Sequence, residues 1–440
     1  MKYYSTNGKA PIADLHKAVV KGLAEDRGLY MPEKINKLPK EFFDNIEKMS
    51  FQEIAYTVAS AFFGEDVDPD ALHDIVYDTL QFDCPVVNVK DNIYTLELFH
   101  GPTLAFKDVG ARFMARLLQY FIKQENNHKE VNVLVATSGD TGSAVANGFL
   151  GVDGIHVYVL YPKGKVSPIQ ECQFTTLGKN ITAIEVDGVF DDCQALVKNA
   201  FMDAELNEHM KLTSANSINV ARFLPQAFYY FNAYARMKEI ANTQHLSPNT
   251  QLVMCVPSGN FGNICAALFG HEMGLPIKRF IAANNANDIF YNYLQTGKYE
   301  PKPSKQTLAN AMDVGDPSNF ARIYDLYGKS HAKITSLISG ATYSDEQIKA
   351  TMRKCYKDSG YILDPHGACG YQALKDGLQA GEVGVFCETA HPAKFKEKVD
   401  DILGIDVEIP ERLAAFMRGQ KQSVPMSKDF ADFKAFLMKQ

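Results

Sequence analysis

Two short glycine-rich segments contain residues suited to binding an anion. Ser138-Gly139-Asp140-Thr141-Gly142 follows an apolar run at 131–136, and Ser258-Gly259-Asn260-Phe261-Gly262 follows another at 252–256. Glycine permits positive φ and close approach of backbone N–H groups, and a helix start adds partial positive charge. An ordinary strand-to-helix turn has a similar composition. Two such turns in one chain nevertheless favour a pair of phosphate or oxyanion sites.

Neither segment matches a nucleotide-binding fingerprint. Both lack the G-x-x-x-x-G-K-[ST] pattern and the G-x-G-x-x-G pattern. A phosphate held without a lysine and without magnesium indicates a phosphorylated cofactor rather than a nucleoside triphosphate. No group of Cys and His residues has the spacing of zinc ligands, so no metal site is predicted.

Lys107 is a candidate nucleophilic amine. In HGPTLAFKDVGARFMARLL, Gly101 and Pro102 mark a loop, and apolar residues at helical spacing begin after Asp108, which we predict to be the N-cap. The apolar Phe106 and the positive helix end both disfavour the ammonium form of Lys107. A neutral amine is what Schiff-base chemistry requires. From the spacing alone, a surface lysine that precedes a helix is a better interpretation than a nucleophilic amine.

The elements that would position these residues change character along the chain. Apolar residues at three- and four-residue spacing predict helices at 12–24, 42–49, 51–63 and 69–80. Segments 85–90 and 93–98 flank Asp91-Asn92 and predict a hairpin. Strands are then predicted at 131–136, 155–160, 181–186, 252–256, 279–282 and 383–387, with helices between them and loops at 242–250 and 301–304. This alternation is typical of a wound α/β fold with a largely parallel sheet.

Composition narrows the class of protein. The 440 residues include 46% hydrophobic and 22% charged residues, which excludes a disordered or low-complexity chain. The net charge of −7 argues against nucleic acid or an anionic membrane as partner. An anionic substrate would therefore need a local cluster of positive groups. The 8 scattered cysteines, the lack of an apolar leader and the lack of an 18-residue apolar stretch predict a soluble, cytoplasmic protein.

HGPTLAFKD resembles the pyridoxal-phosphate lysine segment of the threonine synthase family. Other segments agree in order: YYSTNGKAPIADLHKAVVKGLAEDRGLYMP, SGDTGSA, YPKGKVSPIQ, SANSINVARFLPQ, SGNFGN, LDPHGACGYQAL and TAHPAKF. The resemblance extends from about Tyr3 to Phe395, and residues 396–440 match no motif. It implies a fold type II pyridoxal-phosphate enzyme, with a mostly helical domain at 1–83. Residues 84–440 would form an α/β body of two interleaved subdomains with the cofactor cleft between them.

The resemblance also implies the cofactor site. Lys107 would bind pyridoxal 5′-phosphate through a Schiff base, and Thr389 would hydrogen-bond the pyridine nitrogen. The cofactor phosphate would lie on Ser258, Gly259, Asn260, Phe261, Gly262 and Asn263. Asp140 would face the ring oxygen, where other branches of the family carry Asn. An anionic Asp140 would repel that oxygen, so its role stays open.

The substrate implied is O-phospho-L-homoserine, converted with water to L-threonine and phosphate by γ-elimination and β-addition. Lys107 would be the general base. Candidates for the substrate phosphate are Thr141, Ser217, Arg222 and Asn263. Lys163 and Lys165 could add charge or belong to a solvated loop. His100, His366 and His391 lie in matched segments but receive no chemical role.

Two alternatives remain open from the sequence. A related pyridoxal-phosphate β-lyase or dehydratase would act on serine or threonine, which have no side-chain phosphate, so Arg222 and Ser217 discriminate. A catalytically silent paralogue would bind the cofactor or a protein without turnover, but the retained Lys107 and Thr389 disfavour it. Either a monomer or a homodimer is compatible with the sequence.

Overall fold

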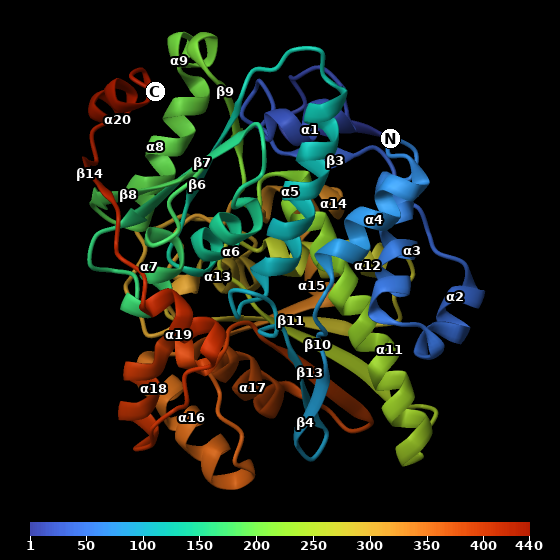
Figure 1. Cartoon of the computed structure of the whole chain (residues 1–440). Helices are drawn as coiled ribbons and strands as arrows, with labels where there is room; N and C mark the ends of the chain where they lie inside the picture. Colours follow the sequence, from blue (N-terminus) through green and yellow to red (C-terminus); the bar gives the residue numbers. More distant parts are fainter. The chain divides into compact units, whose positions relative to one another are not determined.

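The computed structural model describes residues 1–440, which form two compact units built from interleaved segments (Figure 1). Unit 1 comprises Met1–Glu33, Lys107–Arg222 and Ile409–Gln440. Unit 2 comprises Lys34–Phe106 and Phe223–Glu408. The expected boundary lay between residues 83 and 84. In the structure Met1–Glu33 belong to unit 1, whereas Lys34–Phe106 belong to unit 2. None of the helices combines the length and apolar character that a membrane span requires.

Unit 1 contains a parallel sheet of five strands in the order β14-β8-β7-β6-β9. The strands are β6 (Val131–Ala136), β7 (Ile155–Pro162), β8 (Ile181–Asp187), β9 (Lys211–Ser214) and β14 (Val424–Ser427). The helices are α5 (Lys107–Gln124), α6 (Asp140–Phe149), α7 (Pro168–Thr175), α8 (Phe190–Met202), α9 (Ala204–His209), α19 (Glu411–Met417) and α20 (Phe430–Leu437). Every residue of the valine-rich β6 is buried, as expected for a central parallel strand. In Figure 1 the red β14 runs beside the green β8, although many residues separate them in sequence.

The start of unit 1 is less helical than predicted. Strands β1 (Lys2–Ser5), β2 (Ala13–Asp14) and β3 (Tyr30–Pro32) form an antiparallel sheet, and α1 spans only Leu15–Lys21. Asp14 caps α1 by accepting from the N–H of Lys17, and Gly22 ends the helix at φ 78°. The helix is therefore shorter than the predicted 12–24, because β2 precedes it and Gly22 ends it.

Unit 2 contains a sheet of six strands in the order β12-β11-β10-β13-β5-β4. The strands are β4 (Val86–Lys90), β5 (Ile93–Glu97), β10 (Gln251–Pro257), β11 (Arg279–Asn284), β12 (Ile338–Thr342) and β13 (Glu382–Glu388). Neighbours are parallel except β4 and β5, which form the predicted hairpin. The strands predicted from apolar runs in both units are confirmed.

Helices flank this sheet and account for the rest of unit 2. They are α2 (Lys40–Asn45), α3 (Phe51–Phe63), α4 (Pro69–Thr79), α11 (Ala227–Gln244), α12 (Gly262–Glu272), α13 (Ile289–Thr296), α14 (Phe320–Leu326), α15 (His331–Leu337), α16 (Asp345–Ser359), α17 (Pro365–Gly377) and α18 (Lys396–Leu403). Short 3₁₀ helices lie at η1 (Ile46–Lys48), η2 (Leu224–Gln226), η3 (Asn310–Met312) and η4 (Pro392–Phe395). Helix α10 (Val220–Phe223) lies where the chain passes from unit 1 to unit 2. The predicted helices at 51–63 and 69–80 are confirmed, and α11 extends through part of the predicted loop at 242–250.

Helix α5 begins two residues earlier than predicted. The helix begins at Lys107, and Asp108 lies buried in its first turn instead of capping it. Just before the helix, Leu104 adopts φ 60° and Ala105 pairs with Ala390 in an isolated bridge. Lys107 is therefore itself a helical residue.

Candidate active site

Lys107 contacts a hydroxyl of the first glycine-rich turn. Its Nζ donates to Oγ1 of Thr141, which lies in the first turn of α6. The lysine side chain is half-buried, and Thr141 is buried. Two of the predicted site residues, Lys107 and Thr141, are thus in direct contact within unit 1.

The first turn uses part of its N–H groups internally. The hydroxyl of Thr137 accepts from the N–H of Gly139 at 2.9 Å and from the N–H of Gly142 at 2.8 Å. Gly139 has φ 143°, and a side chain there would collide with Gln170 at 2.6 Å. The turn is closed by its own threonine, so it offers fewer N–H groups to an anion than its sequence indicated.

Asp140 is buried beside Gln170 in this turn. Its Oδ1 accepts from Nε2 of Gln170 at 2.9 Å, and 1% of the residue is exposed. The amide of Gln170 therefore solvates part of the carboxyl group. A contact between Asp140 and the cofactor ring remains a prediction.

Arg222 is held against the helix that begins at Lys107. A Cβ at Gly110 would lie 2.3 Å from Nη1 and 2.3 Å from the carbonyl oxygen of Arg222, so only glycine permits this approach. Nε of Arg222 donates to the carbonyl oxygen of Ala215 at 2.7 Å, and the residue is 2% exposed. Because residues three apart share a helix face, Arg222 packs on the face of α5 that includes Lys107.

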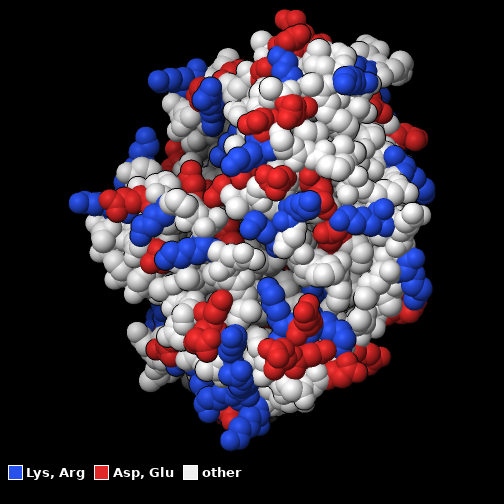
Figure 2. All heavy atoms as spheres, turned by 90° about the vertical axis from the view of Figure 1, so that its left-hand side faces the viewer, with Lys and Arg blue, Asp and Glu red and all other residues white.

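Ser217, Lys163 and Lys165 are further candidates for the substrate phosphate in unit 1. Ser217 is half-buried in the segment between β9 and α10. Lys163 and Lys165 are exposed after β7, and no hydrogen bond or ion pair joins them to Lys107, Thr141 or Arg222. On the face shown in Figure 2, Lys and Arg side chains are interspersed with Asp and Glu. The buried candidates for the substrate phosphate in unit 1 are therefore Thr141 and Arg222.

The second glycine-rich turn differs from the first at the residue before its serine. Pro257 of β10 stands where Thr137 stands in the first turn, so no side chain closes the turn from within. No hydrogen bond in the protein takes up the backbone N–H groups of Gly259, Asn260, Phe261, Gly262 and Asn263. Phe261 is left-handed at φ 65°, and α12 begins directly after it. These residues, 259–263, form an open N–H cradle at the carboxyl end of a parallel strand.

The side chain of Asn263 braces the cradle. Its Oδ1 accepts from the hydroxyl of Ser258 at 2.7 Å and from the N–H of Ile264 at 2.9 Å, and its Nδ2 donates to Pro257 at 2.8 Å. The carbonyl of Ser258 accepts from Nδ2 of Asn284 at 2.9 Å. Asn263 can therefore serve an anion through its backbone N–H, while its amide holds the turn.

Thr389 directly follows β13, and its residue is buried. No hydrogen bond within the protein takes up its hydroxyl, whereas its carbonyl accepts from the N–H of Phe106 at 2.8 Å. Nζ of the buried Lys394 donates to the carbonyl of Thr103 at 2.8 Å. The segment before Lys107 and the segment carrying Thr389 are thus fastened together within unit 2.

A buried set of ionisable residues in unit 2 was not predicted from the sequence. Asp364, His366 and Glu388 lie together, and the residues are at most 2% exposed. The available signal was Asp-Pro-His at the start of an apolar helix, which predicts an N-cap at Asp364 but not its partner. Glu388 lies on a distant strand and could not be associated with it.

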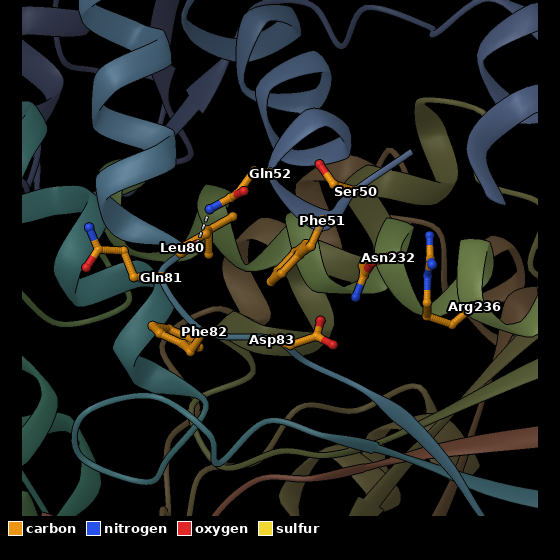
Figure 3. Close-up of a pocket in the computed structure, with 9 residues that line it drawn as sticks. All are labelled: Ser50, Phe51, Gln52, Leu80, Gln81, Phe82, Asp83, Asn232 and Arg236. Carbon is orange, nitrogen blue, oxygen red and sulfur yellow. Dashed lines mark hydrogen bonds between the residues drawn. The ribbon is translucent and has the colours of Figure 1, made fainter. Parts of the chain in front are cut away.

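A pocket of about 470 Å³ lies elsewhere in unit 2 (Figure 3). Its lining consists of Ser50, Phe51, Gln52, Leu80, Gln81, Phe82, Asp83, Asn232 and Arg236. Nε2 of Gln52 donates to the carbonyl of Leu80 at 2.8 Å across its edge. None of the predicted site residues lines this pocket, so it is separate from the candidate active site.

Comparisons with known proteins cover the whole chain. The family model for pyridoxal-phosphate dependent enzymes matches residues 82–387, that for the threonine synthase N terminus matches 2–80, and that for the threonine synthase C-terminal region matches 367–437. The last match covers most of the stretch in which no motif was found. The chain is 43% identical to threonine synthase of Serratia marcescens over 438 residues, covering 100% of this chain and 99% of that protein.

Solved structures agree with these matches. The crystal structure of threonine synthase from Escherichia coli is 43% identical, with a TM-score of 0.93 and 100% of both chains covered. The structure of pyridoxal-phosphate-bound threonine synthase from Brucella melitensis is 34% identical, with a TM-score of 0.89, covering 100% of this chain and 99% of that one. The fold is therefore that of fold type II pyridoxal-phosphate enzymes.

Proposed function

The chain belongs to the threonine synthase family of pyridoxal-phosphate-dependent enzymes, and we propose that it converts O-phospho-L-homoserine and water into L-threonine and phosphate. It is a lyase of this family and uses pyridoxal 5′-phosphate. One observation supports the substrate most directly. Arg222, a cation suited to phosphate, is packed on the helix of Lys107, while a separate open N–H cradle is present for the cofactor phosphate.

The residues present fit the cofactor. The cradle at 259–263 offers five backbone N–H groups to the phosphate, which suits a dianion at a helix start. The hydroxyl of Thr389 is available for the pyridine nitrogen, and Lys107 supplies the amine. When bound, the cofactor supplies an electron sink for negative charge on the substrate carbons.

Arg222 would hold the substrate phosphate. Its guanidinium group offers paired N–H donors that match two phosphate oxygens, and its position is fixed by Ala215 and by contact with Gly110. Thr141 and Ser217 would complete the binding of the phosphate with hydroxyl groups. This cluster supplies the local positive charge that a protein of net charge −7 requires.

Lys107 would carry the proton transfers, and Thr141 would orient its amine. Nζ of Lys107, already bonded to the hydroxyl of Thr141, removes the proton from Cα of the substrate and then one from Cβ. Phosphate leaves Cγ, held by Arg222. Water then adds its hydroxyl at Cβ, and protons return to Cγ and Cα. The hydroxyl of Thr141 keeps the amine oriented between these positions.

Measuring both products tests this proposal. Incubation of the holoenzyme with O-phospho-L-homoserine should release phosphate and threonine in equal amounts. Phosphate accompanied by a keto acid instead of threonine would show an elimination enzyme. Turnover of serine or threonine with no turnover of phosphohomoserine would favour the alternative lyase or dehydratase. A cytoplasmic location and a monomeric or homodimeric state are part of the proposal, and all eight cysteines are free thiols, as a reducing compartment requires.

A further inference from the structure

His366 joins the cradle to buried carboxyl groups. Its Nδ1 lies 2.5 Å from Oδ2 of Asp364, and its Nε2 lies 3.1 Å from the backbone N of Ala311. A backbone N–H can only donate, so Nε2 must be the unprotonated nitrogen and Nδ1 carries the proton to Asp364. Both ring nitrogens are thereby committed, and the imidazole has a fixed tautomer and orientation.

Asp364 and Glu388 form the inner end of this arrangement. The N–H of Asp364 donates to Oε1 of Glu388 at 2.8 Å, and the N–H of Gly367 donates to Oδ1 of Asp364 at 2.8 Å. Burial and the neighbouring Asp364 raise the pKa of Glu388 well above its ordinary value. Burial opposes ionisation of Asp364 as well, but His366 and the hydrogen bonds it accepts lower its pKa. Asp364 accepts hydrogen bonds from Nδ1 of His366 and from the N–H of Gly367, so it is the carboxyl group that holds the imidazole.

Ala311 is the outer end and touches the cradle. It lies in η3, and its carbonyl oxygen is so close to Gly259 that a Cβ there would meet it at 2.4 Å. The N–H of Gly259 is one of the five open donors. The N–H of Ala311 is held by His366, and the carbonyl oxygen of the same residue, in the following peptide group, packs against Gly259, the first residue of the cradle.

The far end of the same turn is anchored separately. Asp313 accepts from the hydroxyl of Thr307 at 2.7 Å, from its N–H at 3.0 Å and from Nδ2 of Asn285 at 3.0 Å. Nothing in that set reaches the N–H of Ala311. Within η3 the N–H groups of Met312 and Asp313 donate to the carbonyls of Ala309 and Asn310, and the N–H of Ala311 donates to His366, which ties this turn to α17.

We propose that His366 is a positioning residue for the cofactor phosphate, which sets the direction of the cradle N–H groups through Ala311 and Gly259. The inference rests on the proposed use of pyridoxal phosphate and adds a residue to it. Pyridoxal differs from pyridoxal 5′-phosphate only in lacking the phosphate. A residue that acts on the cradle should affect binding of the phosphorylated compound alone.

The test compares dissociation constants of pyridoxal 5′-phosphate and pyridoxal for the full-length apoenzyme. His366→Phe keeps a ring but removes the acceptor for Ala311, and should weaken binding of pyridoxal 5′-phosphate about tenfold while leaving pyridoxal within about twofold. His366→Gln restores an acceptor and should recover most of the affinity. The matched control is His331→Phe, because Nε2 of His331 is hydrogen-bonded to the carbonyl oxygens of Tyr293 and Leu294 and not to the cradle. The control should bind both compounds as the wild type does.

Gly259→Ala keeps the proposal falsifiable if His366→Phe does not fold. Its Cβ displaces the same Ala311 contact without touching the carboxyl pair, so it should show the same selective loss. Equal weakening of both compounds, or unchanged binding of both, in the folded variants would overturn the role of His366. Failure of the wild type to bind either compound would instead overturn the proposed function.

Discussion

The backbone N–H of Phe106 donates to the carbonyl oxygen of Thr389 at 2.8 Å. The residue immediately before the candidate Schiff-base lysine is thus fixed to the residue whose hydroxyl is predicted to meet the pyridine nitrogen. This backbone hydrogen bond joins two distant segments of unit 2, and side-chain substitution leaves it intact.

Substitution of Lys107 should abolish the lysine-bound form of the cofactor. Lys107→Ala should lose the visible absorbance of that form and reduce kcat by about a thousandfold or more, because it removes both the nucleophilic amine and the base. Lys123→Ala, an exposed position in the same helix, is the matched control and should keep both properties. Retention of the lysine-linked absorbance by Lys107→Ala would assign the Schiff base to another residue.

Gly110 should be essential for substrate affinity although it touches no substrate. Alanine is the better helix former by about 1 kcal/mol, so a loss in Gly110→Ala must come from the collision with Arg222. We expect KM for O-phospho-L-homoserine to rise about tenfold, and Arg222→Lys to raise it similarly by losing the paired donors. Arg116→Lys is the control, since Nη1 of Arg116 donates to the carbonyl of Arg112 within the same helix. An unchanged KM in both site variants would remove Arg222 from the phosphate site.

Thr389→Val should separate cofactor binding from turnover. The substitution preserves shape and removes only the hydroxyl, so the cofactor should still bind while kcat falls about tenfold. Thr79→Val is a suitable comparison, because Thr79 is also buried and its hydroxyl donates to the carbonyl of Ile75 in its own helix. If kcat of Thr389→Val equalled that of the wild type, the hydroxyl would have no role at the ring nitrogen.

Glu382 should make stability depend on pH in the acid range. The paired hydrogen bonds from Arg279 lower the pKa of this buried carboxyl from 4.5 to about 2, with a further bond from Lys278. The carboxylate therefore stabilises the folded protein above pH 4.5, and this contribution is lost as pH falls through about 2. Glu382→Gln should be about 2–3 kcal/mol less stable at pH 7 in urea unfolding followed by circular dichroism.

The comparison across pH provides the check on Glu382. The difference between Glu382→Gln and the wild type should shrink steadily between pH 4.5 and pH 2. Glu346→Gln, at an exposed helix position, should differ little from the wild type at any pH. A constant difference for Glu382→Gln over this range would mean that the ion pair does not stabilise the fold.

The regular elements that surround the site were predictable from apolar runs, and the exceptions are short. The strands at 131–136 and 252–256 are rich in valine and wholly or almost wholly buried, so composition and environment agree. By contrast β9, β12 and β14 were missed, because each is only four or five residues long and contains Ser, Gly or Pro. These three strands form because neighbouring strands pair with them, and not because their own residues favour a strand.

The candidate site was predicted as a set of residues but not as an arrangement. The sequence presents the two glycine-rich turns as equivalent, yet Thr137 closes one and Pro257 leaves the other open. That difference depends on where one hydroxyl points. The contact of Gly110 with Arg222 and the association of Asp364 with Glu388 likewise join distant segments, which local periodicity cannot reveal.

Strand β14 has a consequence for synthesis on the ribosome. It pairs with β8 through residues 424–427, so β8 remains an open sheet edge until that late segment has been translated. Unit 2, whose segments end at Glu408, can complete its own sheet first. The nascent chain therefore passes through a stage in which unit 1 carries an unprotected edge, and that stage is where chaperone demand and aggregation should concentrate.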